Sequence, residues 1–316
     1  MSTDTTTSPP LSVTIDETGP FAGVVTLTLE QPGSPMVVLD EALIRRIEHA
    51  LKSLPKMMNG LVLASASSRV FIAGADLKTI QFNAEDKDGD RKLDAYLAYG
   101  QRVFGMLCEL PCPTAAAIGG AALGGGLELA MHCDGLIGAP SASGKPYPVG
   151  LPEAGLSICP GWGGSNLLPA RMDAAEAIRR TATGKPMMYE EAVSAGIFDR
   201  VAPSASELLS TAKQWVMEHK AKMGQSGTGG IPRRDGAPSK WIGRPGIKAN
   251  ALAGLAKVGE QGLQGEAARA VMDAIRAGLE HGWQHALDME RRELVRLRAA
   301  PAGRAAIAAF FERGKK

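Results

Sequence analysis

Short apolar runs that alternate with helical patterns are the feature that most constrains this fold. Gly60–Ala66 and Thr114–Ile118 are runs of buried-strand type, and Arg91–Leu110 between them has apolar residues at helical spacing. Near the start of the chain, Ser12–Asp16 and Gly23–Leu29 alternate apolar and polar residues on either side of a Thr-Gly-Pro turn, which predicts a hairpin. Strands that are separated by helices predict the α/β class, in which helices cover a central sheet.

The second half of the chain, from near Asp173, is predominantly helical in pattern. Helical spacing predicts four helices besides Arg91–Leu110, at Leu39–Leu54, Ala174–Thr181, Glu190–Ala195 and Glu207–Met217. Met223–Asn250 is rich in Gly, Pro, Ser and basic residues, which is typical of a linker or a surface excursion. Basic residues in such a stretch usually only increase solubility, and we interpret four of them in this way: Arg233, Arg234, Lys240 and Arg244. From Leu252 to the end, the pattern predicts about three more helices.

These patterns predict three regions. They are a disordered tail at 1–11, a core at 12–203 and a helical C-terminal region at 204–316, which contains the Gly/Pro-rich excursion at 223–250.

The balance of charge and the residue usage argue against several kinds of partner. The 35 basic and 33 acidic residues nearly cancel, so the overall charge does not favour nucleic acid or an anionic membrane. No stretch is long and apolar enough to span a bilayer, and Met1–Ser12 lacks the basic start and apolar run of a signal peptide. The four cysteines form no C-x-x-C pair, and the five histidines have no metal-site spacing. We therefore expect a cytoplasmic protein with reduced thiols, no metal, no membrane association and no nucleic-acid partner.

A glycine-rich turn lies where an expected strand gives way to a helix. Ala121–Glu128 reads A-A-L-G-G-G-L-E and follows the apolar run that ends near Ile118. Residues without side chains let a ligand approach the backbone, and the unsatisfied N–H groups at a helix start favour developing negative charge. The spacing fits neither a phosphate-binding loop nor a Rossmann turn. On its own, such a turn is more often explained by close packing than by an oxyanion site.

Two further segments follow expected strands. Phe71–Lys78 reads F-I-A-G-A-D-L-K and could supply another exposed backbone N–H and, through Lys78, a cation near a ligand phosphate. Gly150–Leu156 reads G-L-P-E-A-G-L and places Glu153 in an apolar loop. Taken singly, the first is a loop that leads into a helix, and Glu153 is a cap or a surface charge. Glu128 alone could likewise merely interact with the helix dipole.

Together and in this order, the three segments resemble the signature of the crotonase superfamily, which contains the enoyl-CoA hydratases and isomerases. In that signature a G-A-D loop, an A-L-G-G-G-x-E-L-A turn and a P-E-x-x-L-G-x-x-P-G-x-G-G loop converge. The resemblance covers roughly Val13–Pro203. It implies a crotonase-like spiral of ββα repeats, to which this chain adds a C-terminal helical region.

The resemblance also implies a reaction, the addition of water to the 2,3 double bond of a 2-enoyl-CoA, which yields a 3-hydroxyacyl-CoA. The N–H groups of Ala75 and Gly125 would form the oxyanion hole. Glu128 would activate the water, and Glu153 would protonate the α-carbon. Four more positions are implied to bind the substrate: Ala73, Asp76, Lys78 and Gly124. No cofactor is expected, since coenzyme A is part of the acyl-CoA substrate.

Other readings stay open. By the same resemblance, family isomerases, which only shift a double bond, use a site with one carboxylate. The pair of glutamates therefore favours hydration, although a single base could also move a proton between carbons. The alternatives are an enoyl-CoA isomerase or another acyl-CoA lyase and, in a different class, a non-catalytic or RNA-binding relative. The effect of the insertion at 141–147, between the two glutamates, is open as well.

The C-terminal sequence is similar to the end of the hydratase domain of bifunctional fatty-acid oxidation proteins. Three segments carry this similarity: Glu290–Leu294, Pro301–Arg304 and Phe310–Arg313. Those proteins also carry a 3-hydroxyacyl-CoA dehydrogenase, and this sequence ends at Lys316. We therefore expect a hydratase that works with a separate 3-hydroxyacyl-CoA dehydrogenase. A homo-oligomer, a trimer or a hexamer, is the assembly that the resemblance implies.

Overall fold

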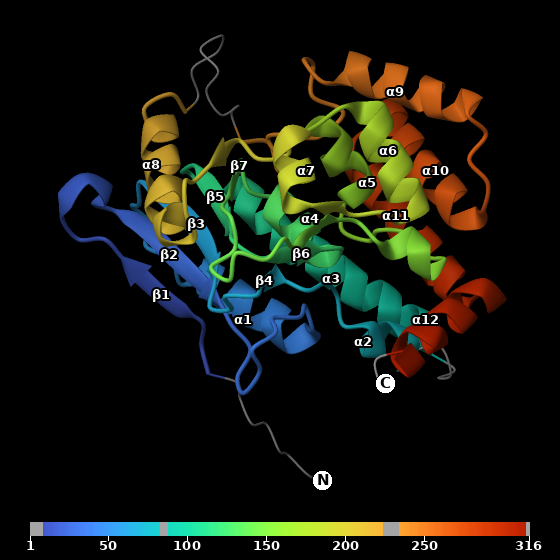
Figure 1. The fold of residues 1–316 in the computed structure, drawn as a ribbon, viewed down its shortest axis with the longest axis horizontal. Coiled ribbons are helices and arrows are strands. Elements are labelled where there is room, and N and C mark those ends of the chain that lie inside the picture. Colours follow the sequence, from blue (N-terminus) through green and yellow to red (C-terminus); the bar gives the residue numbers. More distant parts are fainter. Residues whose placement is uncertain (1–8, 83–87, 224–233, 314–316) are drawn as a thin grey trace.

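Two β-sheets form the centre of the molecule and helices surround them, which confirms the predicted α/β class (Figure 1). The computed structural model describes residues 9–82, 88–223 and 234–313. Over these residues, the larger sheet contains, in spatial order, β1 (Ser12–Ile15), β2 (Val24–Leu29), β3 (Gly60–Ser65), β5 (Thr114–Ile118), β7 (Gly135–Gly138) and β10 (Arg200–Val201). The smaller sheet contains β4 (Val70–Ile72), β6 (Ala121–Leu123), β8 (Pro148–Gly150) and β9 (Met187–Met188).

Successive turns of the chain contribute one strand to each sheet. β3, β5 and β7 are neighbours in the larger sheet, and the strands that follow each of them, β4, β6 and β8, are neighbours in the smaller one. All of these pairs are parallel, because a crossover returns the chain to the same end before each new strand. This arrangement is the spiral of ββα repeats that the resemblance implied. β1 and β2 pair antiparallel and confirm the predicted hairpin.

Helices occupy the crossovers and the second half of the chain, close to the predicted ranges. Their bounds are α1 (Glu41–Lys52), α2 (Leu77–Phe82), α3 (Gly89–Glu109), α4 (Gly125–Met131), α5 (Gly164–Leu167), α6 (Ala174–Thr183), α7 (Tyr189–Ser194), α8 (Leu208–Lys220), α9 (Lys248–Glu260), α10 (Glu266–His281), α11 (Trp283–Ala299) and α12 (Pro301–Arg313). The sequence also explains some of these ends. Asp40, for example, caps α1 by accepting the N–H of Leu43 at 2.7 Å.

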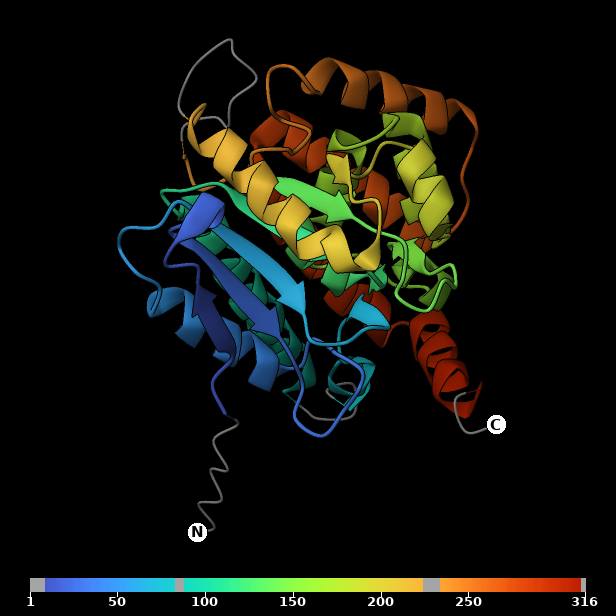
Figure 2. The same cartoon turned by 60° about the vertical axis from the view of Figure 1, so that its left-hand side comes forward.

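Helix α8 covers one face of the larger sheet (Figure 2). Trp215 and Val216 of this helix pack on apolar residues of β2, β3, β5 and β7. A Cβ added at Gly60 or at Gly135 would lie 2.8 Å from these side chains, so the two glycines allow the helix to approach the strands closely. The other face of the sheet packs against the main core, to which α1, α3 and α4 contribute. Since α8 extends the packing of the sheet beyond residue 203, the division into a core and a C-terminal region stays a prediction.

From Lys248 to Arg313 the structure has four helices, α9 to α12, where about three were predicted from Leu252 to the end. One more helix results because α11 ends before Ala300, whose backbone is extended (φ −67°, ψ 152°), and α12 begins at Pro301. Proline has no N–H and disfavours helical backbone in the residue before it, so it ends one helix and starts the next. Among the helices of the described segments, none combines the length and the apolar character that a membrane crossing requires.

We predicted that the four basic residues of the excursion only increase solubility, and this prediction was wrong for three of them. Arg234 forms a bidentate pair with the buried carboxylate of Asp134, with both distances at 2.7 Å. Lys240 pairs with Asp199, and Arg244 donates to Asp235 and to two backbone carbonyls. These pairs anchor the described end of the excursion. Arg233 and residues 224–232, like residues 1–8 of the predicted tail, lie outside the described residues.

Candidate active site

An apolar cavity of about 390 Å³ opens beside the smaller sheet, where the three sequence segments meet. The first segment contributes Ala73, Gly74 and Ala75, the second Gly124, Gly125 and Glu128, and the third Pro152 to Leu156 except Ala154. Further apolar side chains on its wall are Leu77, Ile80, Leu97, Trp162, Leu294 and Phe310. The last two come from α11 and α12, so the C-terminal helices close the cavity. No residue of the insertion at 141–147 lines it.

Two backbone N–H groups without a protein acceptor border this cavity. Leu39 donates to the carbonyl of Gly74 and accepts from Asp76, so the N–H of the intervening Ala75 points away from Leu39. Gly125 is the first residue of α4, and the first N–H groups of a helix have no intrahelical partner. Within the part of the chain that the structure describes, neither N–H has an acceptor. Both donors are therefore free to stabilise an oxyanion.

Gly124 is required to be glycine by two observations. Its backbone lies at φ +51°, ψ −128°, a conformation that L side chains rarely adopt, and its N–H donates to the carbonyl of Gly150 at 2.9 Å. A Cβ on this residue would lie 2.5 Å from Oε1 of Glu153. The glycine thus lets the third segment approach the start of α4 and leaves the N–H of Gly125, not its own, available.

Glu128 lies one turn into α4 and is 1% exposed. Its Oε1 accepts the backbone N–H groups of Trp162 and Gly164, both at 2.8 Å. These two bonds orient the carboxyl group toward the cavity, which Glu128 lines. Two N–H donors on one oxygen favour the ionised form of the group.

Glu153 begins the short 3-10 helix η2 (Glu153–Leu156) and lines the same cavity. Its Oε2 is buried and has no hydrogen-bond partner among the described residues. A buried carboxylate oxygen without a donor disfavours the ionised form. The hydrogen bonds to Glu128 thus favour its ionised form, whereas Oε2 of Glu153 has no such donor among the described residues, although both side chains line one cavity.

A third buried carboxyl group, Glu290 of α11, completes the cluster and was not predicted as a site residue. It is 0% exposed, and it accepts the N–H groups of Gly163 at 2.5 Å and of Ser165 at 2.8 Å. A sequence signal for it existed. Ala286, Leu287, Glu290, Leu294 and Leu297 share one apolar face of α11, and a glutamate on such a face needs a buried partner.

Burial raises the pKa of all three carboxyl groups, and repulsion between them adds to this effect for Glu128 and Glu153. Burial, and then repulsion by Glu290 and Glu153, raises the pKa of Glu128 well above its ordinary value, against the N–H donors of Gly164 and Trp162. Burial raises the pKa of Glu153 to about 8 and that of Glu290 to about 7. No ion pair in residues 9–82, 88–223 and 234–313 gives any of the three a lysine or arginine partner. Near neutral pH the cluster therefore retains protons, and Glu153, whose buried Oε2 has no hydrogen-bond partner among the described residues, is suited to hold one.

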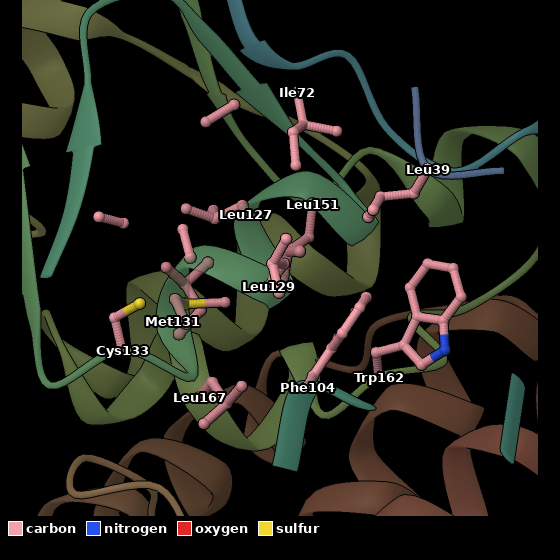
Figure 3. Packing of buried hydrophobic residues seen from close by; sticks show 14 of the residues in the cluster. Leu39, Ile72, Phe104, Leu127, Leu129, Met131, Cys133, Leu151, Trp162 and Leu167 are labelled. Carbon is pink, nitrogen blue, oxygen red and sulfur yellow. The ribbon is translucent and has the colours of Figure 1, made fainter. Parts of the chain in front are cut away.

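Trp162 connects the elements around this cluster. Its indole N–H donates to the carbonyl of Leu97 at 3.0 Å, and its ring packs against Phe104 at 5.3 Å between centroids. Figure 3 shows Trp162 and Phe104 side by side below Leu39. A Cβ on Gly125 would lie 2.3 Å from the indole ring, so packing also requires glycine at the second of the three glycine positions. Close packing thus accounts for this glycine, and the oxyanion role of its N–H stays a prediction.

The remaining predicted substrate-binding residues divide between two cavities. Ala73 and Gly124 line the apolar cavity, whereas Asp76 and Lys78 line a neighbouring one of about 620 Å³. Asp76 accepts the N–H groups of Lys78 and Thr79, which is the geometry of a cap at the start of α2. Lys78 itself is exposed and is available to an anionic group. In the described residues no cluster of His, Cys, Asp or Glu has the arrangement of a metal site.

Replacing Glu153 by glutamine is expected to make the protein relatively more stable as the pH rises. The pKa of this carboxyl is raised in the folded protein to about 8, so the stability it contributes is present below its ordinary pKa and is lost as the pH rises through about 8. Glutamine does not titrate. The urea midpoint of Glu153→Gln minus that of the wild type should therefore increase from pH 5 to pH 8. Glu260→Gln, at an exposed position of α9, is the control and should have a constant difference. A difference that falls with pH would contradict the assigned environment.

The arrangement has the parts that acid–base chemistry on a carbonyl compound needs. Two N–H donors can stabilise an oxyanion, a carboxyl group that accepts two N–H groups can take up a proton, and a carboxyl group with one unpartnered buried oxygen can deliver a proton.

Comparison with known proteins gives consistent matches. The family model described as "Enoyl-CoA hydratase/isomerase" matches residues 20–226. The chain is 31% identical over 291 residues to the "Fatty acid oxidation complex subunit alpha" of Vibrio cholerae, a match that covers 90% of this chain and 39% of that protein. The chain thus spans about two fifths of the length of the curated relatives it matches.

Solved structures share the fold at lower sequence identity. An enoyl-CoA hydratase from Bacillus halodurans superposes with a TM-score of 0.66 at 19% identity, covering 95% of this chain and 100% of that chain. A carnitinyl-CoA dehydratase from Mycobacterium thermoresistibile superposes with a TM-score of 0.69 at 17% identity, covering 96% and 90%. At such identities the likeness concerns the fold alone.

Proposed function

The chain belongs to the enoyl-CoA hydratase/isomerase family, and on this premise we propose that it hydrates 2-enoyl-CoA thioesters to 3-hydroxyacyl-CoA. One observation carries the proposal, namely that Glu128 and Glu153 line the same apolar cavity as the free N–H groups of Ala75 and Gly125. A double-bond shift needs a single base, whereas adding water needs one group to activate the water and one to protonate carbon. The pair of carboxyl groups therefore supports hydration.

The proposed reaction starts with Glu128 ionised and Glu153 protonated. Glu128 takes a proton from water, and the water oxygen forms a bond to C3 of the enoyl group. The electron pair of the double bond moves toward the thioester, whose oxygen accepts hydrogen bonds from Ala75 and Gly125. C2 then takes the proton of Glu153. The product carries the elements of one water, and proton exchange with solvent restores the two glutamates.

The distribution of polar groups supports an acyl-CoA as the substrate. An apolar cavity of about 390 Å³ suits the acyl chain, and two N–H groups suit the thioester oxygen. The adjacent cavity of about 620 Å³ has Lys78, Lys92 and Arg45 on its wall, together with Glu41 and Asp76. Arg45 pairs with Glu41, whereas the exposed Lys78 suits a phosphate of coenzyme A. Since coenzyme A is part of the substrate, no separate cofactor enters the proposal.

The named relatives suggest a setting for this activity. The similarity to a fatty acid oxidation complex subunit supports a role in fatty-acid β-oxidation. In that setting the 3-hydroxyacyl-CoA product would pass to a 3-hydroxyacyl-CoA dehydrogenase. An enoyl-CoA isomerase or a dehydratase is the second candidate, since this family and a structural neighbour carry those names.

The test uses purified protein with crotonyl-CoA and with longer 2-enoyl-CoAs. We expect loss of the conjugated enoyl-thioester absorbance and a product heavier by one water in the mass spectrum. A parallel assay with 3-enoyl-CoAs detects isomerisation as a gain of the same absorbance. Gain with 3-enoyl-CoAs and no loss with any 2-enoyl-CoA would replace the hydratase by an isomerase. Binding of RNA that weakens with salt, without either activity, would support a non-catalytic relative.

A further inference from the structure

Four consecutive backbone N–H groups are shared alternately between two buried carboxyl groups. Trp162 and Gly164 donate to Glu128, whereas Gly163 and Ser165 donate to Glu290. The turn that presents these donors needs glycine, because Gly163 lies at φ +99°. A Cβ on Gly164 would also lie 2.9 Å from Oε1 of Glu128. The turn is therefore held from both sides, by α4 and by α11.

The alternation links the positions of the two glutamates. If the turn moved away from Glu290, it would withdraw both N–H groups from Glu128 as well, since the donors belong to adjacent peptide units. Both bonds to Glu128 fall on its Oε1, which leaves Oε2 for the water. The distance and angle at which this oxygen meets a water thus depend on α11.

Further contacts fix α11 at the turn. Gln101 of α3 donates to the carbonyl of Gly161 and to that of Leu287, both at 2.9 Å, and so joins the turn to the helix. Arg291 reaches back to the side chain of Gln101 at 3.0 Å. Glu290 is consequently part of a hydrogen-bonded connection between the C-terminal helices and the cavity. It does not line the cavity itself, so it would not contact a substrate there.

We propose that Glu290 is a positioning residue for hydration, which holds the Trp162–Ser165 turn so that Glu128 is aligned with the water and is set in a negative environment. This inference rests on the proposed hydratase activity. It adds a residue from the C-terminal helices, outside the three loops and turns at Phe71–Lys78, Ala121–Glu128 and Gly150–Leu156.

The charge of Glu290 gives this role a distinctive consequence. The titratable groups around it are Glu128 on α4, Glu153 on η2 and Cys159 in the intervening loop. All are acidic, so an ionised Glu290 disfavours the ionised form of Glu128 and raises its pKa. Hydration requires an ionised Glu128, so kcat falls as the pH drops through the pKa of this group. We call this fall the acid limb, and the negative charge of Glu290 helps to set the pH at which it lies.

The experiment measures kcat and KM for crotonyl-CoA against pH in the wild type and in Glu290→Gln. Glutamine has the same size, but its NH₂ group faces one of the two N–H donors, Gly163 or Ser165. That N–H group then has no acceptor. We expect kcat to fall by about 10- to 100-fold with little change in KM. Because the negative charge is gone, we also expect the acid limb of kcat to move to lower pH. Glu290→Asp keeps the charge but shortens the side chain, and should lower kcat without that move.

Glu293→Gln, one turn further along α11, is the matched control, since Glu293 pairs with Arg296 at 2.7 Å and does not contact the turn. Glu293→Gln should have the wild-type kcat, and the acid limb of its pH profile should lie at the wild-type pH. An unchanged kcat in Glu290→Gln would overturn the proposal while wild-type hydration stands. A lower kcat with an unmoved acid limb would also overturn it, because it would mean a structural role only. A wild type that hydrates no 2-enoyl-CoA would instead remove the proposed function, and this inference with it.

Discussion

Glu128→Gln is expected to lower kcat for hydration by about 1,000-fold or more, with little change in KM. General-base catalysis contributes about 10²- to 10⁴-fold, and the amide cannot accept the proton of water. The glutamine carbonyl can still accept the N–H groups of Trp162 and Gly164, so the turn should keep its structure. Crotonyl-CoA hydration, followed over a wide range of enzyme concentration, measures the residual rate.

The matched control for this variant is Glu109→Gln. Glu109 is an exposed residue at the end of α3 and does not line the cavity, so its replacement should leave kcat unchanged. The urea midpoint of Glu128→Gln should not fall below that of the wild type, since the substitution removes a buried group that resists ionisation. A variant that retains more than a tenth of the wild-type kcat would contradict the assignment of Glu128 as the base.

Arg234→Met is expected to give a large loss of stability, about 3 to 5 kcal/mol of the free energy of unfolding. Asp134 is 2% exposed, and after this change only the N–H and hydroxyl groups of Thr114 would solvate its carboxylate. The carbonyls of Leu110 and Cys112 would also lose the donors that reach them at 2.9 and 2.6 Å. Methionine keeps most of the side-chain volume, so the loss reflects the unpaired charge. Urea unfolding at pH 7 measures it.

Arg276→Met provides the comparison for this prediction. Arg276 pairs with Asp273 one turn away at 2.7 Å, and both side chains are well exposed, at 48% and 39%. Exposed pairs contribute about 0 to 1 kcal/mol, so this variant should unfold close to the wild type. Equal midpoints for Arg234→Met and Arg276→Met would show that the excursion does not depend on the buried pair.

The parts of the fold that were predicted correctly are those that local sequence determines. Thr114–Ile118 is a strand with the predicted ends, and the runs near Gly60 and Ala174 differ from the structure by at most two residues at either end. Apolar periodicity and turn residues act within a few positions, so a single segment contains the whole signal. The strands of the smaller sheet were harder to identify, because three residues, as in Ala121–Leu123, are too few for a period to be recognised.

The site itself was predicted in part for a similar reason. The glycine-rich turn, Ala75, Glu128 and Glu153 stood out through a resemblance between short segments, and the structure places all of them on one cavity. Asp76 and Lys78 belong to the same segment as Ala75 but line the neighbouring cavity. Adjacent positions in a loop point in different directions, and only the path of the backbone decides where each side chain lies.

By itself, then, the sequence determined the α/β class, the order of the repeats and the segment that presents each glutamate, because these depend on neighbours along the chain. The tertiary structure decided which distant groups meet. Glu290 reaches Ser165 across 125 positions, and Arg234 reaches Asp134 across 100. Nothing local marks such pairs, since a carboxylate on an apolar helix face and an arginine in a polar loop each have many conceivable partners. The packing of α11 and of the excursion determines which partner Glu290 and Arg234 each meet. A buried charge is stable only where hydrogen-bond donors or an opposite charge contact it.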